Sequence, residues 1–164
     1  MNYFGVIDED LNNGEGIRTT IFISGCKHDC KGCHSPESHD FDYGKLFTKE
    51  EQIKVLEKVR ANELLDGITI SGGDPLYSFE DISKFLSLSK KYLRKDQNVW
   101  LYTGYSFDEV RKLVFKYNDA TLFDVVDVLV TEPFMLEKRN PELSFIGSSN
   151  QMIIHIDRKA VKRK

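Results

Sequence analysis

The sequence predicts an α/β fold with a parallel sheet, and three observations support that prediction. Short runs rich in β-branched and aromatic residues alternate along the chain with segments of helical periodicity. This alternation is typical of right-handed βαβ units. The 164 residues contain no internal repeat, low-complexity segment or Pro/Gly/Ser linker. We therefore expect one domain over residues 1–157, followed by a basic, frayed tail over residues 158–164.

Six short runs have the composition of β-strands. Val, Ile, Thr and aromatic residues dominate them, and turn-forming residues flank most of them. They cover residues 18–24, 67–71, 99–103, 125–131 and 152–156, with residues 3–7 as a weaker sixth.

Three helices are predicted between these strands. Thr48 and Glu51 have the spacing of a capping box at one helix start, and Ser106 and Glu109 repeat it at another. The remaining helix opens near Ser78. That helix is expected to bury one face, formed by Ile82, Phe85, Leu86, Ser89 and Leu93. In the other two, residues at helical spacing follow the capping boxes: Ile53, Leu56 and Val59; Val110, Leu113, Val114 and Tyr117.

Polar loops marked by glycine or proline follow four of the predicted strands. They begin at Gly25, Gly72, Gly104 and Glu132. In parallel α/β folds the loops at the carboxyl ends of the strands gather at one rim, where ligands bind. We therefore expect all four loops to border one site.

The first of these loops contains every cysteine of the chain. Cys26, Cys30 and Cys33 follow the spacing CxxxCxxC. Three thiolates can hold three irons of a [4Fe-4S] cluster and leave the fourth iron without a protein ligand. An open iron is a reaction site, and we interpret the three cysteines as its metal ligands.

Two other interpretations of the cysteine loop compete with the cluster. A structural zinc site would take a histidine as its fourth ligand, from His28, His34 or His39. Zinc sites usually pair their ligands on two separate segments, however, and no second cysteine pair exists here. A redox pair formed by the last two cysteines would leave the first without a role.

The second loop has features that suit the ligand of an open iron. The amino and carboxylate groups of a methionine moiety would chelate that iron, and the ammonium group must be held. Backbone carbonyls exposed at Gly72 and Gly73 can accept from an amine, and Asp74 adds negative charge. Alone, Gly-Gly-Asp-Pro is more often an ordinary turn.

The bulk properties restrict the class of protein. The formal net charge is −3 although five of the last seven residues are Lys or Arg, so the body is acidic, which argues against nucleic acid as the main partner. No apolar run approaches the roughly 20 residues that cross a bilayer. The first residues also lack the pattern of a signal peptide. With an odd number of crowded cysteines, this predicts a cytoplasmic protein with reduced thiols and no membrane contact.

CxxxCxxC after one strand and Gly-Gly-Asp-Pro after the next resemble the radical S-adenosylmethionine superfamily. Within it, the chain is similar to the activating proteins of anaerobic ribonucleoside-triphosphate reductases. The matching segments are NGEGIR, GCKHDCKGCHSPES, GITISGGDPLY, VWLYTGY, VDVLV and GSSNQ, which together span residues 13–151 in family order.

This resemblance implies a fold, an activity and partners. The fold is an open, incomplete parallel βα barrel of the radical SAM type. In that family S-adenosylmethionine binds the fourth iron of a [4Fe-4S] cluster, and one-electron reduction cleaves it to methionine and a 5′-deoxyadenosyl radical. The radical takes a hydrogen from a glycine of the large catalytic subunit of the reductase. The implied enzyme is thus a radical SAM oxidoreductase with that subunit as protein substrate and a one-electron donor such as flavodoxin or ferredoxin.

Site residues carry over by position. The metal ligands are Cys26, Cys30 and Cys33. The residues at the methionine end are Gly72, Gly73 and Asp74, and those against the adenosine are Gly32, Cys33 and His34. The resemblance implies no catalytic residue beyond these cofactor ligands.

Three further comparisons with the family pattern bear on the resemblance, one at a single residue and two at residue pairs. A family histidine corresponds to His28, which favours a role beside the cluster over metal ligation. Thr131-Glu132 replaces a frequent Asp-Gly, and Phe145-Ile146 replaces a frequent Trp-Arg. These departures flank the expected site and leave another target open, a glycyl-radical enzyme of the formate-lyase type. A radical SAM enzyme that acts on a small molecule is a separate alternative.

Overall fold

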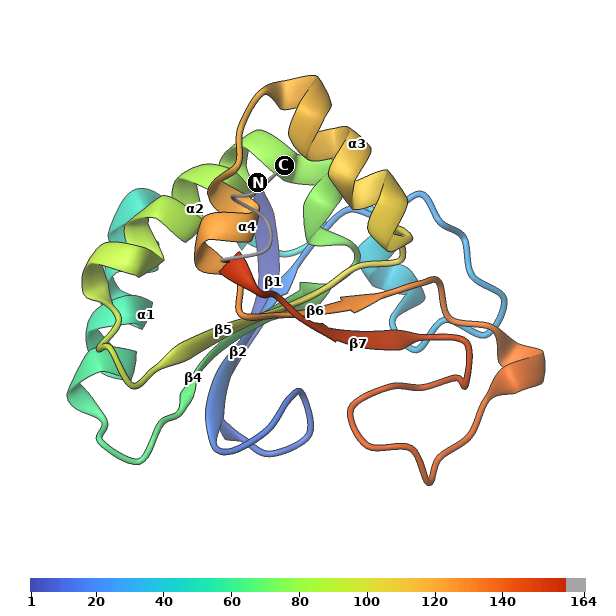
Figure 1. Ribbon diagram of the computed structural model, residues 1–164, viewed down its shortest axis with the longest axis horizontal. Coiled ribbons are helices and arrows are strands. Elements are labelled where there is room, and N and C mark those ends of the chain that lie inside the picture. Colours follow the sequence, from blue (N-terminus) through green and yellow to red (C-terminus); the bar gives the residue numbers. More distant parts are fainter. Residues whose placement is uncertain (159–164) are drawn as a thin grey trace.

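The structure, a computed structural model, describes residues 1–158. One open sheet of seven strands carries the α-helices on one side, and the connection between β6 and β7 extends on the other (Figure 1). The predicted α/β class is confirmed, and within the described range the sheet does not close. The predicted tail lies outside the described residues except for Arg158, whose guanidinium is 2.6 Å from the carboxylate of Asp127.

The strands lie in the order β3-β1-β2-β4-β5-β6-β7. The four inner strands β2, β4, β5 and β6 pair in parallel, whereas β1, β3 and β7 pair antiparallel. A short loop joins β1 to β2, so the two form a hairpin rather than a βαβ unit. The strands are β1 (Asn2–Asp10), β2 (Arg18–Ile23), β3 (Lys45–Leu46), β4 (Gly67–Gly72), β5 (Asn98–Tyr102), β6 (Val128–Thr131) and β7 (Met152–His155).

The strand predictions need two corrections. The run at residues 125–131 becomes a strand only from Val128, because Val125 ends the short helix α4 (Thr121–Val125) and Val126 is its C-cap. Strand β3 was missed because it has only two residues and is defined by its pairing with β1.

The three predicted helices are confirmed as α1 (Lys49–Ala61), α2 (Phe79–Tyr92) and α3 (Phe107–Tyr117). Both predicted capping boxes are present, with the Thr48 and Ser106 side chains accepting from the backbone three residues on. Three short 3₁₀ helices lie in the loops: η1 (Pro36–His39), η2 (Pro75–Ser78) and η3 (Leu136–Lys138). None of the helices in the described part of the chain has the length and apolar character to span a membrane.

The core lies between the sheet and the helices. Ile21, Ile68 and Leu101 of the inner strands are buried there. They belong to the same apolar cluster as Leu56 of α1 and Phe85 of α2. The other face of the sheet carries a smaller apolar cluster around Trp100, Val128 and Val130. Helices therefore cover one face, and the second face is left to the loops that form the site.

Arg18 links neighbouring parallel strands near their amino-terminal ends. Its side chain is fully buried and stacks over Trp100 at 5.5 Å. Its guanidinium donates to Thr69 Oγ1 at 2.8 Å and to the carbonyls of Ile68 and Asn98 at 2.7 and 3.1 Å. Burial lowers the pKa of Arg18 to about 10, which leaves it charged at neutral pH. One side chain thus joins β2, β4 and β5.

Arg18→Met should lower the free energy of unfolding by about 2–4 kcal/mol, because it leaves buried acceptors without donors. Urea denaturation of the iron-free protein measures this loss. The matched control is Arg111→Met, since Arg111 is about half exposed on α3 and its change should stay within about 0.5 kcal/mol. Equal stability of the two variants would contradict the role assigned to Arg18.

Candidate functional site

The loops at the carboxyl ends of the parallel strands line one cavity of about 490 Å³. All four predicted loops contribute to it, which confirms that they border a single site. Their lining residues include Cys26, Gly72, Gly104 and Glu132. The sequence placed Phe145 and Ile146 beside this site, and both line the cavity. It did not predict that Arg139, Asn140, Pro141 and Leu143, in the same connection from β6 to β7, would line it as well.

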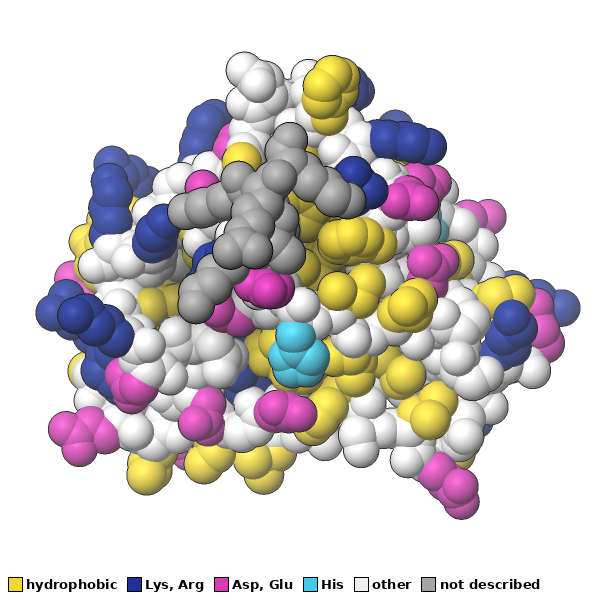
Figure 2. Space-filling view, in the orientation of Figure 1, with side chains coloured by type: hydrophobic (Ala, Val, Ile, Leu, Met, Phe, Trp, Pro, Cys, Tyr) yellow, Lys and Arg dark blue, Asp and Glu magenta, His cyan; other side chains and the backbone are white. Residues whose placement is uncertain are grey.

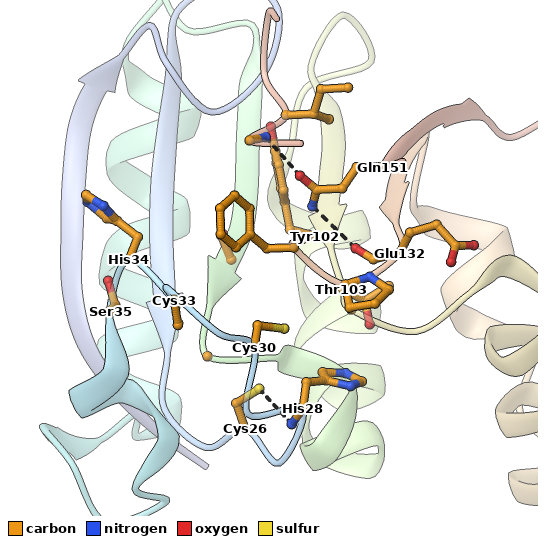
Figure 3. A pocket seen from close by; sticks show the side chains of 18 of the residues that line it. Cys26, His28, Cys30, Cys33, His34, Ser35, Tyr102, Thr103, Glu132 and Gln151 are labelled. Carbon is orange, nitrogen blue, oxygen red and sulfur yellow. Dashed lines mark hydrogen bonds between the residues drawn. The ribbon is translucent and has the colours of Figure 1, made fainter. Parts of the chain in front are cut away.

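The three cysteines are free, partly buried and all part of the cavity lining. Figure 3 shows Cys26 and Cys30 at the base of the site, with Cys33 further along the same loop. The start of the loop is tied down by hydrogen bonds from the amides of Gly25 and Cys26 to the carbonyls of Ser38 and His39. Gly25 has a φ of 99°, and a Cβ there would lie 2.3 Å from the ring of Phe41.

The cavity raises the pKa values of two thiols. Burial is the main cause for both, and it raises the pKa of Cys26 to about 11 and that of Cys30 above its usual value. Three thiols on one loop are a donor set that suits iron, because bound iron favours the thiolate form. The residues present therefore fit a cluster.

Among the residues that the structure describes, no three His, Cys, Asp or Glu side chains converge on the position of one metal ion. A zinc site and a [4Fe-4S] cluster both take thiolate ligands, so metal and sulfide analysis separates the two interpretations.

The glycine turn lies directly against the start of the cysteine loop. The amides of Gly73 and Asp74 donate to the carbonyls of Ile23 and Gly25 at 2.8 and 2.9 Å. A Cβ on Gly73 would lie 2.7 Å from the carbonyl oxygen of Ser38 and 2.8 Å from that of Gly25. Close approach of two backbones, rather than a positive φ, is therefore what requires glycine at this position.

The structure separates Asp74 from its two predicted companions. Gly72 and Gly73 line the cavity, but Asp74 is only 1% exposed and is not part of the lining. Its carboxylate accepts from Leu76 N, Thr103 Oγ1 and Gly104 N, at 2.8–3.0 Å. The predicted interaction of Asp74 with a methionine amine stays a prediction.

The three residues assigned to the adenosine all line the cavity. Gly32 has a φ of 75° and packs against Leu136 of the connection between β6 and β7, so that a Cβ would lie 3.0 Å from that side chain. Figure 3 shows His34 and Ser35 on the opposite side of the site from Glu132 and Gln151. Gly32, Cys33 and His34 thus form one wall of the cavity.

The opposite wall is held by the GSSNQ segment, for which the sequence suggested no role. Gln151 Oε1 accepts from the amides of Gly147 and Ser148, and its Nε2 donates to the carbonyl of Glu132. Ser148 Oγ accepts from the amide of Met135 at 3.1 Å. The contacts of Gln151 with Glu132 and of Ser148 with Met135 join residues 19 and 13 positions apart, and the local sequence pattern did not reveal them.

Both departures from the family pattern contain a strained residue of this wall. Glu132 has a φ of 78° and Phe145 a φ of 66°, and neither is glycine. The left-handed conformation costs a non-glycine residue about 1–2 kcal/mol. The glycine that the resemblance leads one to expect at position 132 would fit this backbone without strain.

Glu132→Gly should therefore raise the free energy of unfolding by up to about 1 kcal/mol, once the extra chain entropy of glycine is subtracted. Glu137→Gly is the control, because Glu137 is exposed and has no positive φ. That variant should lose stability. Chemical denaturation measures the change in the free energy of unfolding of each variant. A decrease in both variants would show that Glu132 is not strained.

The cavity, its three free thiols and the glycine turn are features of an iron–sulfur protein. Comparison of the sequence with known proteins gives the same class. The chain matches the 4Fe-4S single cluster domain over residues 12–154. It is 37% identical to the anaerobic ribonucleoside-triphosphate reductase-activating protein of Haemophilus influenzae, covering 93% of this chain and 97% of the relative. The proteins of that name from Escherichia coli K12 and Enterobacteria phage T4 are 31% and 35% identical, over 95% and 93% of this chain and 99% and 93% of theirs. The chain belongs to the family of anaerobic ribonucleoside-triphosphate reductase-activating proteins.

Proposed function

We propose that this chain activates an anaerobic ribonucleoside-triphosphate reductase by cleaving S-adenosylmethionine at a [4Fe-4S] cluster and generating a glycyl radical on the large catalytic subunit. One observation carries the proposal: Cys26, Cys30 and Cys33 line the same cavity as the Gly72–Gly73 turn. The residues proposed to bind iron and those proposed to face an amine thus border the same cavity. The names of the relatives supply the reductase as the protein acted on.

Different residues of the cavity would bind the cluster and S-adenosylmethionine. The three thiolates would hold the cluster, the backbone at Gly72 and Gly73 would face the methionine amine, and the wall around Gly32 and His34 would face the adenosine. Within residues 1–158, Arg139 is the only Lys or Arg that lines the cavity, so we assign it to the carboxylate. When bound, the cluster and S-adenosylmethionine supply one-electron cleavage chemistry.

The fold supports the same assignment. Four parallel strands carry the site at their carboxyl ends, and the helices lie on the side away from it. This arrangement is consistent with the incomplete βα barrel of the radical SAM type. The need for reduced thiols favours the cytoplasm as the place of action.

A protein substrate is consistent with the surface beside the cavity. On the face shown in Figure 2, hydrophobic side chains gather around β7, where Met152 is 54% exposed. Lys and Arg side chains lie mainly over the helices on that face. An apolar area of this kind is typical of protein contact sites. The electron donor, of the flavodoxin or ferredoxin class, would be a second protein partner.

Anaerobic reconstitution with iron and sulfide tests the cofactor assignment. We expect about four irons and four sulfides per chain. Addition of S-adenosylmethionine and a low-potential reductant should then release methionine and 5′-deoxyadenosine, measured by chromatography. One zinc per chain without labile sulfide would refute the proposal.

A further inference from the structure

His28 lies between the first two cysteines, yet its ring is directed toward the sheet rather than toward solvent. The Nε2 atom is 2.7 Å from Asp74 Oδ2, and the side chain is only 17% exposed. The ring meets Tyr105 edge-on at 4.7 Å and Tyr77 at 5.2 Å. The cysteine loop is thus attached, in its middle, to the carboxyl ends of β4 and β5.

The neighbouring Gly104 gives independent support for a specific position of the His28 ring. A Cβ on Gly104 would lie 2.6 Å from the imidazole Cδ2 of His28. The φ of Gly104 is not positive, so its backbone conformation does not require glycine. A larger residue at position 104 would instead occupy the space that the His28 imidazole needs.

Asp74 is a rigid partner for this ring. Thr103 and Gly104 hold its carboxylate from the end of β5, and Leu76 holds it from the start of η2. Its backbone amide bonds to Gly25, beside the first cysteine. A buried carboxylate with these partners has a fixed position, and a group bonded to it acquires that position as well.

We propose that His28 is a positioning residue: through Asp74 it fixes the cysteine loop relative to the glycine turn, and thereby sets the cluster ligands at a defined distance from the amine site. The proposal rests on the proposed function for the identity of the two ligands. It also gives Asp74 a different role from that of its glycine neighbours, which border the cavity directly.

The test compares His28→Phe, which keeps a ring but loses the hydrogen bond, with His28→Gln, whose amide retains a donor. In the iron-free protein, Cys30 of His28→Phe should react with iodoacetamide about tenfold faster than in the parent, while His28→Gln should recover most of the protection. His155→Phe, on the exposed part of β7, should react like the parent. Gly104→Ala displaces the ring without changing His28 and should expose Cys30 as His28→Phe does.

In the reconstituted protein, His28→Phe should bind S-adenosylmethionine about tenfold more weakly than the parent at equal iron content. Unchanged alkylation of Cys30 in both His28→Phe and Gly104→Ala would overturn the proposal. Failure of the parent to take up a cluster would refute the proposed function instead, and the alkylation comparison would still decide the role of His28.

Discussion

Replacing Cys30 by alanine should abolish cleavage of S-adenosylmethionine and leave the domain folded. Cys30 is partly exposed and lies in a loop outside both apolar clusters, so its loss removes little packing. It would, however, leave one more iron of the cluster without a protein ligand. We expect the yield of 5′-deoxyadenosine after reduction to fall by at least about a hundredfold, because the chemistry belongs to the cluster and not to the chain.

Lys31→Ala is the matched control, since Lys31 is exposed and lies in the same loop between two cysteines. It should retain iron content and cleavage. Urea denaturation of both iron-free variants should give free energies of unfolding within about 1 kcal/mol of the parent. Full cleavage by Cys30→Ala would remove Cys30 from the set of cluster ligands.

Gly73→Val should weaken S-adenosylmethionine binding by about a hundredfold, and should weaken it more than it reduces iron content. The added Cβ would meet two carbonyl oxygens at 2.7 and 2.8 Å, so the turn must move away from the cysteine loop. That movement displaces the carbonyls assigned to the methionine amine. Anaerobic calorimetry of the reconstituted protein measures the affinity, and iron analysis of the same sample measures the cluster.

Gly5→Ala is the control for this substitution. A Cβ on Gly5 would meet the Phe22 ring at 3.7 Å, an ordinary contact distance, and Gly5 does not line the cavity. Its affinity for S-adenosylmethionine should match that of the parent. Equal affinities of Gly73→Val and Gly5→Ala would show that the glycine turn does not contact the cofactor.

Local sequence signals predicted much of the fold. The capping boxes at Thr48 and Ser106 formed as expected, because each depends on residues only three positions apart. The start of β6 was placed too early, because Val125 and Val126 have the composition of a strand, but Val125 ends α4 and Val126 is its C-cap. Such choices depend on tertiary packing, which composition does not encode.

The candidate site was predicted in its chemistry and less well in its geometry. Spacing identified the cysteines and the glycine turn, and the order of strands and helices predicted that they would meet at one rim. The burial of Asp74 beneath His28 and the clamp at Gln151 depend on contacts between distant residues. The contribution of Arg139, Asn140, Pro141 and Leu143 to the cavity was missed for the same reason.

Electron paramagnetic resonance spectroscopy tests the central claim most directly. The reconstituted protein would be reduced and mixed anaerobically with the large subunit of an anaerobic ribonucleoside-triphosphate reductase. We predict the doublet of a glycyl radical that requires S-adenosylmethionine and is absent with Cys30→Ala. A competent cluster that cleaves S-adenosylmethionine but produces no doublet on the reductase would contradict the account, and a doublet on a formate-lyase type enzyme instead would identify another target.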